Sequence, residues 1–322
     1  MTQQVPLAPS GICIVDKPAG LTSHDVVGRI RRILGTRKVG HAGTLDPMAT
    51  GVLVLGVGRG TRFLTYVVGA QKEYLATIRF GIATSTDDAD GEVVGRADVT
   101  GLDTARIRQA MIPFTGAIMQ VPSTVSAIKV QGQRAYARVR AGEEVALAPR
   151  PVQVDEFTLI GVIGSSDGSD AANNADLSNP AQHLDCEVRV TCGSGTYVRA
   201  LARDLGQALG TLGHLTALRR TRVGDFTIAD AKNLPELTPA DLMPLGVAAA
   251  RCLPVQVVSP FDRANLVHGR SITTTQPPGA TAVAAIDEAG DLIAVVEPAI
   301  EPGGGSDQSP FSLRPAVVFA DA

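Results

Sequence analysis

The sequence between residues 40 and 51 is GHAGTLDPMATG, and the prediction of the fold depends on this stretch more than on any other. Pro47 moves Asp46 out of the helical region of backbone space and stiffens the chain that follows. The glycines allow sharp turns and a close approach to a ligand. We therefore expect a rigid, non-helical loop that presents the Asp46 carboxylate, with His41 five positions earlier. A carboxylate that only bonds to its own turn is the structural alternative.

The segments on both sides of this loop have the periodicity of regular structure. Gly11–Val15 and Val52–Val57 are short apolar runs typical of buried strands. Between them a helix is predicted with Ser23 as its N-cap. Its inward-facing residues would be Val26, Val27, Ile30, Ile33 and Leu34. Glu73–Gly81 alternates as a half-buried strand does. Its buried face would hold Tyr74, Ala76, Ile78 and Phe80.

Further along the chain, helices and strands are predicted on either side of a polar segment. Thr104–Phe114 can form a helix. Gly161–Ala181 consists mainly of Ser, Asp, Asn and Gly, which is typical of a disordered surface insertion between two strands. Cys186–Cys192 alternates as a strand, and a Gly-Ser-Gly turn separates it from a helix that begins near Val198. One more helix is predicted over Leu234–Leu245.

From about Pro254 the pattern changes to short β-prone segments separated by turns rich in Gly and Pro. These segments are Val255–Val258, Ala282–Ile286, Leu292–Val296 and Ala316–Phe319. They predict a small all-β appendix. The mixture of helices and hairpin-like strands in the whole chain favours the α+β class over a doubly wound sheet.

The composition is that of a soluble globular protein, since 44% of the 322 residues are hydrophobic. No apolar run is long enough for a membrane span, and we expect no signal peptide at the start, MTQQVPLAPS. The four cysteines form no CxxC pair and no zinc spacing, which favours reduced thiols in a cytosolic protein. The net charge of −3 conceals basic segments in the N-terminal two-thirds, which would attract phosphates unless they form an ordinary solvated surface.

Two further segments carry groups that could take part in chemistry. The acidic segment at residues 87–90 could be a metal loop, an acid–base pair or a solvated turn, and it lacks the spacing of a calcium-binding EF-hand. In GSGTYVRAL, Arg199 would lie in the first turn of a helix, where it could bind a phosphate or pair with a buried carboxylate. Tyr74 and Tyr197 are either core residues or platforms for stacking.

Taken together, these stretches resemble the TruB family of tRNA pseudouridine synthases. GICIVDKPAGLTSHDVV is similar to the family's first block, KVGHAGTLDPMATGVL to its catalytic block, KEYLATIRFG to its tyrosine block and DDADGE to its acidic block. PSTVSAIKVQGQRAYARVRAGEEV is similar to its RNA-clamping insertion, and CGSGTYVRALARDLG with LRRTRVGDF to its last catalytic block. The resemblance extends from about Gly11 to Phe226.

The resemblance implies a fold of two parts. Residues 1–250 would form a pseudouridine synthase catalytic domain, of the α+β class, on a mixed and mainly antiparallel sheet. Residues 251–322 would form a small C-terminal PUA-like β domain that binds RNA. Within the first domain, residues 120–150 would be the RNA-clamping insertion, and the polar loop at 161–181 is longer than the family's pattern.

The resemblance also implies roles for individual residues. Asp46 would be the nucleophile, Arg199 would pair with it, and Asp88 would engage Arg199 from the other side. Tyr74 would stack on the target base and assist proton transfer at the sugar. The other substrate-binding residues would be His41, which fills the space left by the extruded nucleotide, Tyr197 and Leu218, which line the pocket, Lys17, which buttresses the loop, and Lys129.

By the same resemblance, the substrate would be the uridine at position 55 in the T-loop of tRNA, bound through the T arm. The isomerisation breaks an N1–C1′ bond and forms a C5–C1′ bond without redox change or loss of atoms, so we expect no cofactor and no metal. The carboxylate could attack C1′ or C6, or the C2′ proton could be removed first. We expect a cytoplasmic monomer with no obligate protein partner and no membrane contact.

Three other functions fit parts of the sequence. A chaperone that binds and folds tRNA without chemistry would explain the basic segments but not the loop around Asp46. A guide-RNA-dependent relative is disfavoured by the insertion at Pro122–Val145, which resembles that of the stand-alone enzymes. A hydrolase that uses Asp46 with Asp88 would release free uracil.

Overall fold

The computed structural model describes residues 9–123, 129–130, 133–134, 147–166, 183–274, 281–299 and 311–321. Within these ranges the larger sheet has ten strands. They are β1 (Gly11–Lys17), β2 (Val39–His41), β3 (Thr50–Val57), β4 (Lys72–Phe80), β7 (Gly116–Gln120), β10 (Arg150–Ser166), β11 (His183–Cys192), β12 (Gly213–Val223), β13 (Phe226–Thr227) and β14 (Lys232–Asn233).

A smaller sheet and two ribbons complete the described β structure. The smaller sheet consists of β15 (Val255–Val258), β16 (Ile272–Thr274), β17 (Val283–Asp287), β18 (Leu292–Pro298) and β19 (Phe311–Val318). The ribbons are formed by β5 (Ile82–Thr84) with β6 (Val93–Arg96), and by β8 (Lys129–Val130) with β9 (Gln133–Arg134).

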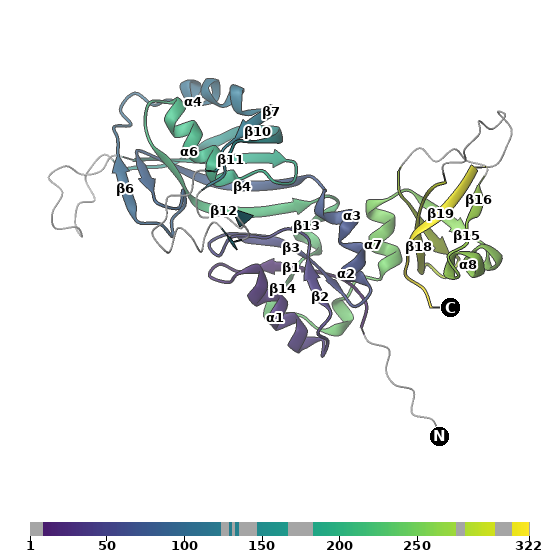
Figure 1. Ribbon diagram of the computed structural model, residues 1–322. Coiled ribbons are helices and arrows are strands. Elements are labelled where there is room, and N and C mark those ends of the chain that lie inside the picture. The colour runs from purple at the N-terminus through teal and green to yellow at the C-terminus, as the bar shows by residue number, and fades with distance from the viewer. Residues whose placement is uncertain are drawn as a thin grey trace.

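The described helices lie mainly beside the larger sheet (Figure 1). They are α1 (Ser23–Ile33), α2 (Gly60–Phe63), α3 (Thr65–Val68), α4 (Thr104–Met111), α6 (Val198–Ala208), α7 (Leu245–Cys252) and α8 (Pro260–Val267). Short 3-10 turns occur at Ile112–Phe114, Ile228–Asp230, Leu234–Glu236 and Pro239–Asp241. No helix in the described ranges combines the length and the apolar character that crossing a membrane would require.

The larger sheet is mixed, and most of its pairs are antiparallel. Its main path runs β14-β1-β3-β12-β4-β11-β10-β7, with β2 paired to β3 and β13 paired to β12. Among the described strands of this larger sheet, only the pairs β1–β14 and β3–β12 are parallel. The predicted α+β class, with a mixed sheet and a small C-terminal β domain, is confirmed.

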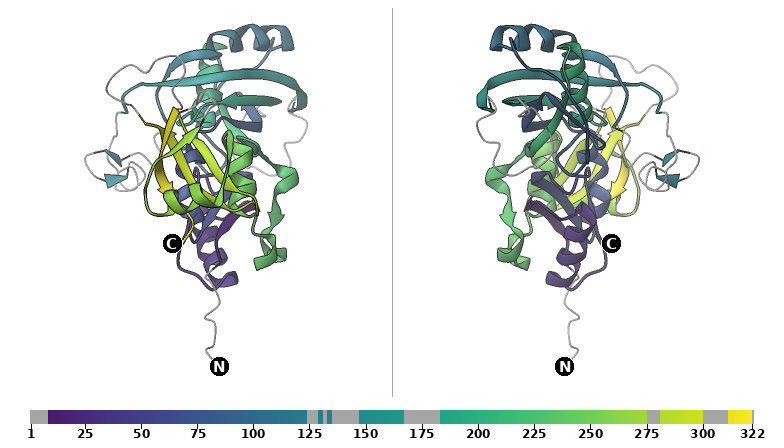
Figure 2. Two further views of the ribbon diagram at one scale, coloured as in Figure 1. Left: turned by 90° about the vertical axis from the view of Figure 1, so that its right-hand side faces the viewer. Right: turned by 90° about the vertical axis from the view of Figure 1, so that its left-hand side faces the viewer.

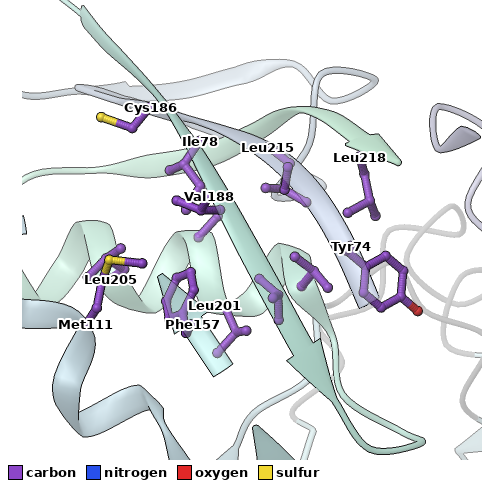
Figure 3. Packing of buried hydrophobic residues seen from close by; sticks show 14 of the residues in the cluster. Tyr74, Ile78, Met111, Phe157, Cys186, Val188, Leu201, Leu205, Leu215 and Leu218 are labelled. Atoms are coloured by element: carbon purple, nitrogen blue, oxygen red, sulfur yellow. The ribbon is translucent and has the colours of Figure 1, made fainter. Parts of the chain in front are cut away.

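The core beneath this sheet follows from the alternation that the sequence shows. Along β4 every second residue is buried, from Lys72 to Phe80, as predicted for its inner face. Helices α4 and α6 cover that face, and Figure 3 shows Ile78 and Val188 of the sheet packed against Leu201 and Leu205 of α6. Burial of these side chains contributes most of the free energy that holds helix and sheet together.

Helix α1 differs from the prediction at both of its ends. Thr22, not Ser23, is the N-cap: its hydroxyl accepts from the Asp25 N–H at 3.0 Å, and the Asp25 carboxylate accepts from the Thr22 N–H at 2.9 Å. This reciprocal pair is a capping box. At the other end, Ile33 was predicted to face inward but is 37% exposed.

One prediction near the polar segment also needs correction. The insertion predicted at Gly161–Ala181 begins too early, because β10 continues to Ser166 and pairs with β11. Bulges in that pairing interrupt the alternation of buried and exposed side chains, and Ile163 is 59% exposed. Backbone pairing with β11, and not burial of side chains, therefore defines this part of the strand. Residues 167–181 lie outside the described residues. Of the insertion at 120–150, the structure describes only 120–123, 129–130, 133–134 and 147–150.

The helix predicted over Leu234–Leu245 is wrong. That segment forms 3-10 turns, and α7 begins only at Leu245. Pro235, Pro239 and Pro244 each remove a backbone donor and prevent a continuous helix. The expected domain boundary after residue 250 falls within α7.

The C-terminal domain is not all-β as predicted, because it contains α8. Its start has ordinary signals: Ser259 accepts from the Asp262 N–H at 3.1 Å, and Pro260 occupies the first helical position. Figures 1 and 2 show the smaller sheet beyond α7, and in Figure 1 α7 lies between this sheet and α2 of the larger domain. Phe319 joins the two parts: it is 2% exposed, and its ring lies 6.3 Å from that of Phe63.

Candidate active site

The loop between β2 and β3 is held by buried side chains. Ser23 Oγ accepts from the Leu45 N–H at 2.8 Å and donates to the Leu45 carbonyl at 3.1 Å. Lys17 Nζ donates to the Pro47 carbonyl at 3.2 Å. Asp46 therefore projects from a segment whose neighbours on both sides are fixed. This is the rigid, non-helical loop that the sequence predicts.

Arg199 joins two carboxylates that are far apart in the sequence. Its Nε lies 3.0 Å from Asp46 Oδ2, and its Nη1 lies 3.2 Å from Asp88 Oδ2. Nη1 also donates to the Thr86 carbonyl at 2.9 Å. The side chains of Arg199 and Asp88 are only 5% and 6% exposed, whereas that of Asp46 is 36% exposed. A buried guanidinium needs such partners; here one partner is buried with it and the other reaches the solvent side.

The surroundings of Asp46 act on its pKa in opposite directions. Burial raises the pKa of the carboxyl above its ordinary value, and the charge of Asp88 adds to that rise. The charge and hydrogen bond of Arg199 lower it, as does Lys17 more weakly. The net effect is a raised pKa, which makes the carboxylate more basic than that of a solvated aspartate. Such a group is suited to covalent or base catalysis.

A cavity of about 250 Å³ opens beside this carboxylate. Its walls come from the loop after β2, from β4 and β12, and from the turn before α6. Five of the predicted site residues line it: Asp46, Tyr74, Tyr197, Arg199 and Leu218. They are brought together by the pairing of β4 with β12 and by the start of α6.

Tyr74 connects the cavity to the core. It is 8% exposed and belongs to the inner face of β4. Figure 3 shows it at the edge of the cluster, near Leu218, with its hydroxyl directed away from the packed aliphatic side chains. Burial raises the pKa of the Tyr74 phenol, while the Arg220 charge beside it lowers that pKa in part. The phenol is therefore neutral at physiological pH and presents an aromatic ring to the cavity.

The other predicted residues lie behind or beside the cavity. Lys17 is fully buried, and burial lowers its pKa to about 8. Its ammonium donates to three backbone carbonyls, those of Pro18, Leu21 and Pro47, which fits a role in holding the loop rather than in contact with substrate. His41, at the end of β2, is not among the described residues that line the cavity. Of Lys129 only the backbone, in β8, is described.

Some buried polar residues at the site are not among those predicted from the sequence. Lys72 and Arg220 line the cavity and are 6% and 0% exposed. Gln120 binds the backbone of Tyr197 on both sides, accepting from its N–H at 2.8 Å and donating to its carbonyl at 3.1 Å. Period-2 spacing could have found the first two, because Lys72 is two residues from Tyr74 and Arg220 is two residues from Leu218. For Gln120 the sequence holds no comparable signal.

Models of two protein families match consecutive parts of the chain. Residues 31–198 match the model of the TruB family pseudouridylate synthase N-terminal domain, and residues 199–264 match that of the tRNA pseudouridylate synthase B C-terminal domain. A protein of Arthrobacter sp. (strain FB24) named tRNA pseudouridine synthase B is 49% identical over 319 residues, which cover 97% of each chain. One of the same name from Thermobifida fusca is 49% identical over 313 residues, 96% of this chain and 98% of the relative.

Solved structures of proteins with lower sequence identity show the same fold. A chain of a Cbf5-Nop10-Gar1 complex superposes with a TM-score of 0.69 at 24% identity, covering 98% of this chain and 86% of that one. A chain of an H/ACA RNP bound to a substrate RNA containing 2′-deoxyuridine gives a TM-score of 0.68 at 22% identity, with 97% and 86% covered. From the two family models and the near full-length relatives it follows that the chain belongs to the TruB family of pseudouridylate synthases.

Proposed function

We propose that this protein isomerises uridine to pseudouridine in tRNA, with the uridine at position 55 of the T-loop as its target and Asp46 as its nucleophile. One observation carries the proposal: a single carboxylate beside a small cavity is bonded to a buried guanidinium, opposite a buried tyrosine. The names of the relatives that are 49% identical support tRNA as the substrate.

The geometry supports covalent catalysis by one carboxylate. Asp46 would form a bond to the nucleotide as the N1–C1′ bond breaks, and Arg199 would keep it ionised until then. The uracil would turn within the cavity, and the bond to Asp46 would break as C5 bonds to C1′. The hydrogen on C5 would leave as a proton, and N1 would take up a proton. No atom other than that exchanged hydrogen enters or leaves the nucleotide. Asp88 holds Arg199 in place, so the aspartates have different roles and do not form an acid–base pair.

The cavity favours a nucleotide that has been rotated out of its RNA. A volume of about 250 Å³ is below the usual range for drug-sized ligands, which suits one planar ring. Extrusion costs a few kcal/mol of stacking and pairing. Stacking on an aromatic side chain returns about 1–3 kcal/mol of that cost. Tyr74 is suited to this contact because its ring lines the cavity.

The decisive experiment is tritium release from tRNA transcript labelled at C5 of uridine, with the purified chain and no guide RNA. The native protein should release tritium from one position, and mapping should place it at 55. Asp46→Asn should abolish release and leave tRNA binding nearly unchanged, because the amide is not a nucleophile. Asp185→Asn is a matched control, since that carboxylate pairs with Arg79 at 2.6 Å, remote from the cavity.

Each alternative gives a different result in that assay. Turnover by Asp46→Asn would remove Asp46 as the nucleophile. Binding by the native chain without release would favour a chaperone, and release only on addition of a guide RNA would favour a guide-dependent enzyme. Free uracil as the product would indicate a hydrolase.

A further inference from the structure

Arg220 is the largest fully buried side chain in the described part of the protein, and it lines the cavity. Its guanidinium donates to three backbone carbonyls. Nε bonds to Val52 at 2.7 Å, Nη1 to Thr44 at 3.3 Å and Nη2 to Gly43 at 3.1 Å. No ion pair in the described residues gives it a carboxylate partner. The Tyr74 side chain also forms a hydrogen bond with Arg220. A buried cation whose partners are carbonyls and a phenol, with no carboxylate, is costly to keep, which points to a use beyond packing.

These bonds connect Arg220 to β3 and to the loop that carries the nucleophile. Val52 belongs to β3, and Gly43 and Thr44 begin the turn that leads to Asp46. On the other side, Arg220 is the register partner of Tyr74 in the pair of β12 with β4. One side chain therefore contacts the loop of the nucleophile and lies directly across from the tyrosine.

The backbone of Arg220 is itself fixed against β3. It pairs with Gly51, where an added Cβ would lie 2.1 Å from the Arg220 carbonyl oxygen, so only glycine permits this approach. Gly43 is less tightly packed: a Cβ there would lie 3.6 Å from Nη1, which is ordinary van der Waals contact. The strand, the guanidinium and the loop are therefore in direct contact with one another.

We propose that Arg220 is a positioning residue that sets the distance between the Asp46 carboxylate and the Tyr74 ring. Both groups must meet the same extruded nucleotide, and a displacement of about 1 Å in such an arrangement can reduce the rate about 100-fold. The charge of Arg220 also acts on the site. It lowers the pKa of Tyr74, which burial raises, and it adds to the lowering of the pKa of Lys17 and His41 by burial. The proposal rests on the proposed function.

Two variants separate positioning from stability. Arg220→Lys keeps the charge but cannot bond to three carbonyls at once, because an ammonium lacks the planar fork. We expect its single-turnover rate at saturating tRNA to fall about 100-fold, with the dissociation constant for tRNA close to the native value. Arg79→Lys is the control: it makes the same substitution in the same sheet, where Arg79 binds Asp185. It should lower the thermal midpoint and leave the single-turnover rate unchanged.

A rescue experiment tests the same point by a second route. Arg220→Ala would leave a cavity shaped for a guanidinium and open to the active site. Added guanidinium ion, in the millimolar range, should restore turnover in a saturable way, but should not restore Asp46→Asn. The proposal is overturned if Arg220→Lys turns over at the native rate, if Arg79→Lys loses as much rate as Arg220→Lys, or if guanidinium does not rescue a folded Arg220→Ala. Absence of tritium release by the native chain would overturn the proposed function instead.

Discussion

Asp46 needs to be ionised to act, yet its surroundings resist ionisation. Burial and the nearby Asp88 charge raise its pKa, and Arg199 supplies the main opposing effect. A carboxylate held this way is more nucleophilic than one with an ordinary pKa, while the guanidinium keeps enough of it charged at neutral pH. The two partners of the network, Arg199 and Asp88, should therefore shift the pKa of Asp46 in opposite directions.

The acid limb of the pH–rate profile can show this. Because the reactive form is the carboxylate, kcat/KM should fall as the pH falls through the raised pKa of Asp46. Arg199→Met removes the charge that lowers this pKa, so the limb should move to higher pH. Asp88→Asn removes a charge that raises it, so the limb should move to lower pH. Tritium release measured across pH gives the acid limb of each variant. Shifts of the two acid limbs in the same direction would contradict the opposite effects of Arg199 and Asp88 on the pKa of Asp46.

At the scale of elements, adjacent residues at the start of α1 have separate tasks. Thr22 caps the helix, whereas Ser23 points to the nucleophile loop and bonds to both backbone groups of Leu45. The predicted cap was thus displaced by one residue, because the pattern S/T-x-x-D fits Thr22 with Asp25. The helix is the support from which the loop is held.

Alanine variants of Thr22 and Ser23 should therefore have different effects, the first on stability alone and the second on stability and turnover. Thr22→Ala should lower the free energy of unfolding by about 1 kcal/mol and leave turnover unchanged. Ser23→Ala leaves the buried Leu45 N–H without its partner, which costs about 1–3 kcal/mol and loosens the loop. Denaturant unfolding and single-turnover rates would measure the two effects. Equal turnover in both variants would mean that the loop does not depend on Ser23.

At the scale of the whole molecule, the C-terminal domain is packed against α2 and the residues that precede it. The Arg59 guanidinium donates to the Phe319 carbonyl at 2.6 Å and pairs with Asp321. Arg62 lies over the Phe319 ring, 5.3 Å from its centroid. One hydrophobic cluster continues from Phe63 in the larger domain to Phe319 in the smaller one. The two domains should therefore unfold together.

Phe319→Ala tests that coupling. Removing a buried phenylalanine costs about 3–5 kcal/mol, and here most of the loss falls on the contact between domains. Calorimetry should show the single native transition separate into two, with the smaller domain unfolding first. Phe311→Ala, in the final strand that leads to Phe319 but at a side chain that is 42% exposed, should keep one transition. A single transition in Phe319→Ala would mean that other contacts hold the domains together.

The sequence by itself determined the local features. Alternation along β4, the apolar runs of β1 and β3, and the proline and glycines around Asp46 are properties of neighbouring residues, so local sterics and periodicity reveal them. Where local signals conflicted, the prediction failed: the prolines after Leu234 overrode an apolar pattern. The start of α8 had readable signals that the β-prone segments around it obscured.

Only the tertiary structure decided which polar groups meet. The bond between Asp46 and Arg199 joins residues 153 positions apart (199 − 46), and family resemblance, not spacing, was what suggested it. The contacts of Arg220 and Gln120 had no such guide. Their partners include backbone carbonyls and N–H groups, which nearly all residues have, so the sequence does not indicate which residue the partner belongs to. Strand register and packing alone bring a particular carbonyl within reach of a particular guanidinium.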